Sequence, residues 1–168
     1  MKTLHTVALI LMQFLSAGAR SCSTNDSLAP KAQYGFSLGL NDQTKSSIRP
    51  GFGIGIISDY RINKKLFFGP GMTLSFFRYS PGDVPVSSTV MEFPFHVSVK
   101  PCGEKLRPVI SVGVNYKYDI GFRNSLGVFA EGALGLEKDL KYFTIVPELK
   151  YSYGKNMQAM YFTIGFKG

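Results

Sequence analysis

The chain has 168 residues, enough for one domain of ordinary size and too few for two. Its formal net charge is +8, from 19 Lys and Arg against 11 Asp and Glu. The basic residues are scattered, and no zinc-finger spacing or groove-reading helix accompanies them, so the sequence does not favour nucleic-acid binding. Scattered basic residues in turns instead suit the anionic headgroups of a membrane.

Residues 1–19 have the three parts of a secretory signal peptide. Lys2 supplies the basic start, Val7–Leu15 the apolar run and Ala17–Ala19 a small-x-small cleavage site. The apolar run is too short for a transmembrane helix, which needs about 20 residues. We therefore expect export, cleavage after Ala19 and a polar periplasmic lead-in over residues 20–33.

The two cysteines are Cys22, just after the predicted cleavage site, and Cys102, in a predicted turn. An exported chain meets an oxidising compartment, so a disulfide between them is one prediction and two free thiols are another. Lipidation of Cys22 is a third, although Arg20 stands where lipoprotein signals place a small or apolar residue. Two cysteines do not predict a metal site.

From Tyr34 onward, apolar and polar residues alternate in about eight segments. Since side chains alternate across a strand with period two, each segment predicts a strand. The segments are 34–40, 51–60, 66–77, 89–100, 108–119, 126–137, 142–153 and 160–167. Asn, Asp, Gly and Pro between them predict short turns. We predict an all-β fold over residues 34–168: an eight-stranded antiparallel up-and-down transmembrane β-barrel of the outer-membrane type.

Alternation also occurs in soluble barrels of the lipocalin kind, so the composition of the two faces decides between them. One face of segment 51–60 carries Phe52 and Ile54, and the other carries Gly53 and Gly55. Small residues fit the narrow interior of an eight-stranded barrel. An apolar band that recurs on every strand is too large to expose to water and suits hydrocarbon.

The tyrosines fall at or near the predicted strand ends, as expected for rings at membrane interfaces. One rim is predicted to carry Tyr34, Tyr60 and Tyr142, and the other Tyr79, Tyr116, Tyr118, Tyr151, Tyr153 and Tyr161. With both termini periplasmic, the periplasmic turns are 61–65, 101–107 and 138–141. The outer loops are 41–50, 78–88, 120–125 and 154–159.

The charged residues predicted to face the lumen are the only candidate site. They are Glu92, His96, Lys100, Lys117, Asp119, Glu131, Glu137, Glu148 and Lys150. A tight turn after Glu137 would place Glu131 and Glu148 nearly opposite one another, with Lys117 and Lys150 as the nearest cations. A general acid/base pair or a translocation path is one interpretation. A salt-bridged plug is preferred, because buried charges are usually paired.

Motifs for other chemistry are missing from the sequence. His96 is the only histidine after the predicted signal peptide, which disfavours a zinc site and leaves a serine triad a single candidate base. The glycine-rich runs GFGIGI and GPGM lack the helix and lysine of a phosphate loop. We therefore expect no enzymatic activity, no cofactor and no metal.

Three stretches resemble the PorT-like outer-membrane β-barrel family of the Bacteroidetes. They are TVMEFPFHVSVK, LRPVISVGVNYKYDI and IVPELKYSYG, which resemble its E-x-P, Arg-Pro and E-x-[RK]-Tyr-Ser-Tyr-Gly strands. The resemblance extends from YGFSLGLN to FTIGFKG. It implies a cell outer-membrane protein with a role in the envelope or as an accessory to type IX-like secretion.

Together these features predict a non-enzymatic outer-membrane barrel with a plugged polar lumen. Its expected partners are outer-membrane lipid, the barrel-assembly machinery and secretion-system components. The alternatives are a small-solute pore or ligand-binding barrel, and an outer-membrane lipid-modifying enzyme. Fold alone does not decide between them.

Overall fold

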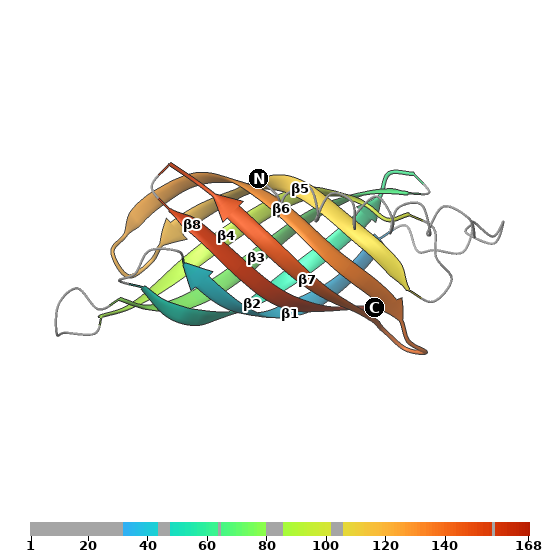
Figure 1. Cartoon of the computed structure of the whole chain (residues 1–168), viewed down its shortest axis with the longest axis horizontal. Coiled ribbons are helices and arrows are strands. Elements are labelled where there is room, and N and C mark those ends of the chain that lie inside the picture. Colours follow the sequence, from blue (N-terminus) through green and yellow to red (C-terminus); the bar gives the residue numbers. More distant parts are fainter. Residues whose placement is uncertain (1–31, 44–47, 64, 80–85, 102–105, 156) are drawn as a thin grey trace, which may run out of the picture.

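The computed structural model describes residues 32–43, 48–63, 65–79, 86–101, 106–155 and 157–168, which form eight strands (Figure 1). The strands are β1 (Ala32–Gln43), β2 (Ile48–Arg61), β3 (Leu66–Tyr79), β4 (Val86–Val99), β5 (Arg107–Asp119), β6 (Asn124–Asp139), β7 (Thr144–Tyr153) and β8 (Gln158–Lys167). β1 begins at Ala32, so the last two residues of the predicted lead-in belong to the barrel. The predicted signal peptide, Cys22 and Cys102 lie outside the described residues.

Each strand pairs antiparallel with the next, and β8 pairs with β1, which closes the barrel. The closing ladder runs from Gly35 opposite Lys167 to Gln43 opposite Ala159. The predicted eight-stranded, antiparallel, up-and-down barrel is therefore confirmed. The described residues contain no helix that is both long and apolar enough to cross a membrane.

The barrel has two mouths, which differ in the segments that reach them. The termini mouth holds the starts of β1, β3, β5 and β7 and the ends of β2, β4, β6 and β8. The loop mouth holds the opposite ends of the eight strands and the connection 120–123. Figure 1 shows the tilted strands running between the two mouths. The bounds of the eight strands lie within a few residues of the predicted segments.

The barrel wall is apolar outside and polar inside. Leu40 and Val128 point outward and are 65% exposed, whereas Ser75 and Ser152 point inward and are fully buried. Interior space is limited because an eight-stranded barrel is only just wide enough for side chains. The outward band is the surface that hydrocarbon would cover, and the lumen is the interior of the described barrel.

Exposed tyrosines lie toward both mouths of the barrel. At the termini mouth, Tyr34 donates a 3.3 Å hydrogen bond to the hydroxyl of Tyr60, and Tyr142 is exposed. Toward the loop mouth, Tyr116, Tyr151 and Tyr153 are also exposed on the outer wall. Tyr161 is different: it was predicted at the outer rim but points into the lumen and is 6% exposed. The prediction for Tyr161 was wrong because proximity to a strand end was used without its inward position in the alternation of β8.

Candidate functional site: the charged lumen

Five charged side chains cross the termini mouth and form a connected set, called here the mouth ring: Asp59, Lys100, Arg107, Glu137 and Lys167. The Lys100 Nζ lies 2.7 Å from the Asp59 Oδ2 and 2.7 Å from the Glu137 Oε2. The Arg107 Nη2 lies 2.8 Å from the Glu137 Oε1. The Lys167 ammonium also donates to the Asp59 carboxylate.

The mouth ring joins parts of the chain that are far apart in sequence. Asp59 is on β2, Glu137 is on β6 and Lys167 is on β8, so their ion pairs cross the lumen rather than follow one strand. Both carboxylates are almost fully buried. A buried carboxylate without a partner is costly, and the ring therefore fixes these strands relative to one another.

Lys100 follows the last residue of β4 and is the central cation of the mouth ring. Its Nζ also lies 4.3 Å from the centre of the Phe67 ring. Burial by itself lowers the pKa of Lys100, but the Asp59 and Glu137 carboxylates outweigh that effect and hold the pKa above its usual value. Lys100 therefore stays charged through neutral and mildly alkaline pH.

A second group of charges lies deeper in the lumen around Lys117, which is fully buried. The Lys117 Nζ is 3.2 Å from the Glu92 Oε2 and 3.9 Å from the Glu131 Oε1. Asn115 donates hydrogen bonds of 2.8 Å to each of these carboxylates. Lys117 also donates to the hydroxyl of Tyr161. The side chains of three neighbouring strands and β8 thus meet at one ammonium group.

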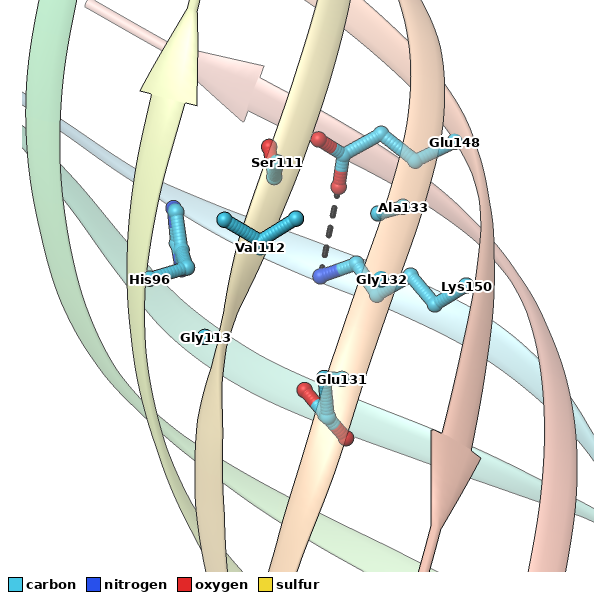
Figure 2. Close-up of a pocket in the computed structure, with 9 residues that line it drawn as sticks. All are labelled: His96, Ser111, Val112, Gly113, Glu131, Gly132, Ala133, Glu148 and Lys150. Carbon is cyan, nitrogen blue, oxygen red and sulfur yellow. Dashed lines mark ion pairs between the residues drawn. The ribbon is translucent and has the colours of Figure 1, made fainter.

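Lys150 and Glu148 form a third group of lumenal charges, with 3.2 Å between Nζ and Oε2. Figure 2 shows this pair pointing into a cavity that His96 and Glu131 also line. This first cavity has a volume of about 20 Å³. A second cavity, of about 30 Å³, also borders on Glu131 and Lys150 and extends toward β1. Each has room for only one or two water molecules.

The register of β6 and β7 corrects one predicted contact. Glu131 lies opposite Ser152, and Glu148 lies opposite Gly135, so the two carboxylates are not cross-strand partners. They were predicted to face each other because a tight turn after Glu137 was assumed. The strand β6 instead runs to Asp139 before the chain turns back, which displaces the pairing.

The structure places all six predicted site residues in the lumen, in three different surroundings. Glu92, Lys117 and Glu131 share one network, whereas Lys150 pairs with Glu148. His96 lies apart from both, with its Nε2 3.6 Å from the Asp59 Oδ1. The three remaining lumen charges of the sequence prediction are Lys100 and Glu137 in the mouth ring and Asp119 near the loop mouth.

The most connected carboxylate of the lumen, Asp59, was missed in the sequence. Its Oδ2 pairs with Lys100, which follows β4, and with Lys167 on β8, and its Oδ1 lies 3.6 Å from the Nε2 of His96 on β4. The alternation that placed Gly53 and Gly55 inside also places Asp59 inside, so extending the pattern to the end of the strand would have found it. The same extension along β8 would have found Tyr161 and Lys167.

Apolar side chains and one capped carboxylate pack inside the described part of the loop mouth. Phe77, Val90 and Phe129 point inward there and are buried. Asp119 accepts hydrogen bonds from the hydroxyl of Ser88, at 2.5 Å, and from the backbone N–H of Phe122, at 3.1 Å. The described part of this mouth therefore presents a packed surface rather than an open channel.

Two glycines on neighbouring strands make room for His96. Gly69 on β3 and Gly113 on β5 both lie beside it. A Cβ at Gly69 would come within 2.2 Å of the His96 Nε2, so a larger residue must displace the imidazole. His96 can lie beside Asp59 because Gly69 has no side chain.

Gly69→Ala is expected to lower the free energy of unfolding by about 1–3 kcal/mol, the usual cost of overpacking. The measurement is urea unfolding of the refolded barrel in phospholipid vesicles. Gly132→Ala is the matched control, since a Cβ there meets nothing within 4 Å. Equal urea midpoints for the two variants would contradict this account of His96.

The lumen has few of the elements that catalysis or metal binding requires. Among the described residues, no group of three or more His, Cys, Asp or Glu side chains could hold a metal ion. Its carboxylates already accept hydrogen bonds from, or pair with, Lys, Arg, Asn or Ser, and the two cavities described above are of water size. The arrangement suits the filling of a narrow barrel.

Solved structures with a similar fold are small outer-membrane β-barrels. The Neisserial surface protein A (NspA) has a TM-score of 0.61 and 12% identity over 81% of this chain and 94% of its own. OprG from Pseudomonas aeruginosa has a TM-score of 0.56 and 12% identity over 81% and 93%. Ail, the attachment invasion locus protein of Yersinia pestis, has a TM-score of 0.55 and 10% identity over 81% and 94%.

The chain therefore has the fold of a small, eight-stranded outer-membrane β-barrel. Neither the protein-family models nor the curated protein sequences contain a significant match to it. At this level of identity the likeness concerns the fold, and any role must be argued from the lumen and the two mouths.

Proposed function

We propose that this protein is a non-enzymatic barrel of the cell outer membrane with a closed lumen, which serves the envelope as a structural component. The observation that carries the proposal is the filling of the lumen by paired charges. The mouth ring links strands at the termini mouth, Lys117 pairs with two carboxylates near the centre, and the two lumenal cavities described above are of water size. Such an interior stabilises a scaffold and obstructs the passage of solutes.

The proposed absence of catalysis is supported by the surroundings of His96. Its Nε2 points at Asp59, which two lysines already hold, and its nearest cavity has room for little more than water. A general base needs a substrate proton within hydrogen-bond reach. A cavity of that volume does not admit a lipid chain to His96.

Incubation of the barrel with phospholipid and lipopolysaccharide should leave both intact, and released fatty acid would contradict the proposal.

The proposal is tested by conductance in planar bilayers. The refolded barrel is expected to give no steady ohmic openings under conditions in which a general porin in the same lipid does. Rare, brief openings are compatible with fluctuation of the ion pairs. Steady openings of uniform size would overturn the closed lumen and favour the small-solute pore.

We further propose a PorT-like accessory role in protein secretion, supported by the positions of the motif residues. Glu92 and Pro94 on β4 and Glu148 on β7 face the lumen, where Glu92 and Glu148 take part in its ion pairs. Two motif residues thus belong to the ion pairs of the lumen. A PorT-like barrel with the same interior would need the same residues. Deletion of the gene is expected to reduce secreted protein in the medium, and complementation should restore it. An unchanged secreted fraction would remove this role while leaving the scaffold proposal intact.

A further inference from the structure

Two lysines at the turn between β6 and β7 differ from the paired cations of the lumen. Lys138 and Lys141 are both exposed, and no carboxylate in the described part of the chain lies within ion-pair distance of either. Asp139 lies between them in the sequence, but its carboxylate accepts hydrogen bonds from Arg107 and Thr144. Both ammonium groups are therefore available to an anion from outside the chain.

Lys138 lies at the edge of the apolar outer wall. It pairs in register with Ile145 on β7, and the same register row continues to Phe166 on β8, Phe36 on β1 and Ile56 on β2. Lys138 is the next-to-last residue of β6, whereas the row reaches β2 well inside that strand. Because the strands are tilted (Figure 1), the row runs from the termini mouth into the apolar wall.

Aromatic rings cover the wall beside this turn. The rings of Phe36 and Phe166 are stacked with 5.0 Å between their centroids, and 6.2 Å separates the centroids of Phe143 and Phe166. These three residues are called here the aromatic row. Phe143 directly follows the exposed Tyr142, whose ring centre lies 5.2 Å from the Lys141 Nζ. Amphipathic rings such as Tyr142 concentrate where acyl chains meet headgroups, so the basic turn and the aromatic row adjoin at that level.

We propose that the turn between β6 and β7 binds one anionic phospholipid of the leaflet at the termini mouth. Lys138 and Lys141 pair with its phosphate, and one acyl chain lies along the aromatic row. Charge complementarity supports an anionic headgroup, and the adjoining apolar wall supports a lipid over a soluble anion. The inference rests on the proposed position of the barrel in the outer membrane, but not on the closure of its lumen or on a role in secretion.

The test is gel filtration of the refolded barrel in a mild detergent with equal amounts of phosphatidylglycerol and phosphatidylcholine, followed by mass spectrometry of the retained lipid. Phosphatidylglycerol is expected to be preferred by roughly 5-fold for each lysine, because phosphatidylcholine carries a cation of its own. Equal retention of the two lipids would overturn the lipid site alone. A chain that does not migrate as a folded barrel on unheated gels would overturn the membrane position and the lipid site together.

Matched variants locate the charge effect. Lys138→Gln combined with Lys141→Gln should abolish the preference for phosphatidylglycerol. The control is Arg123→Gln combined with Lys155→Gln at the loop mouth, which removes the same charge from two exposed residues and should keep the preference. If both double variants lost the preference equally, the cause would be general attraction to a cationic barrel, and the site would be rejected.

Phe166→Leu tests the contact with the acyl chain. It should lower the retained phosphatidylglycerol several-fold while keeping the preference over phosphatidylcholine. Phe52→Leu is the control, since the rings of Phe52 and Phe76 are also stacked, at 4.8 Å, in a different part of the outer wall. Equal retention by these two variants would overturn the placement of the acyl chain.

Inorganic phosphate distinguishes a lipid from a soluble anion. Added at constant ionic strength, which keeps the screening of surface charges equal, it should leave the bound phosphatidylglycerol in place. Displacement of the lipid by phosphate would assign the two lysines to a soluble anion and reject the lipid site.

Discussion

Asp59→Asn is expected to lower the free energy of unfolding by about 3–5 kcal/mol, the cost of removing one partner from a buried ion pair. Asn keeps the size of the side chain but removes its charge. Lys100 and Lys167 then lose a shared anion, and Lys100 retains only Glu137. Because Lys167 is on the last strand, we also expect β8 to be less firmly held to the barrel.

The measurement is urea unfolding from phospholipid vesicles, followed by tyrosine fluorescence and by migration on unheated gels. Asp139→Asn is the matched control, since Asp139 also pairs with a ring residue, Arg107, but its side chain is 45% exposed. Exposed pairs contribute about 0–1 kcal/mol. Similar losses for the two variants would show that the mouth ring does not depend on its buried carboxylate.

Much of this fold could be predicted from the sequence because the period-two pattern acts on every strand. A one-residue shift would turn all side chains of a strand to the other face, so the pattern determines which residues are inside. Phe52 and Ile54 outside, with Gly53 and Gly55 inside, illustrate how directly composition reports on the two faces. The same pattern placed the lumen charges inside without reference to any turn.

The partners of the lumen charges could not be predicted in the same way, because they depend on register and on contacts across the barrel. Glu131 and Glu148 were paired incorrectly since the turn after β6 was placed too early. Between β5 and β6, the register shifts after Lys117, where Gly127 has a φ of 94°. No local pattern shows that Asp59 and Lys167, 108 residues apart, share a hydrogen bond.

The deepest lumen cation gives the second large prediction. Lys117→Met is expected to lower the free energy of unfolding by about 3–5 kcal/mol, because it leaves the buried carboxylate of Glu92 and the half-buried one of Glu131 without this ammonium partner. Met retains much of the apolar stem that packs near Phe129 and Tyr161, whose ring centres lie 4.7 and 4.6 Å from Nζ. The loss would thus report the missing charge more than a cavity.

Lys155→Met at the loop mouth is the control, since Lys155 is exposed and its replacement should change stability by less than about 0.5 kcal/mol. Adding Glu92→Gln to Lys117→Met should recover part of the loss, because the double variant has one unpaired carboxylate fewer. Strictly additive losses would mean that Lys117 and Glu92 do not act as a pair, although 3.2 Å separates their charged atoms. Recovery in the double variant would instead show that the stability of the lumen depends on charge balance. Neutral side chains could then replace an ion pair, provided that both of its charged partners are replaced together.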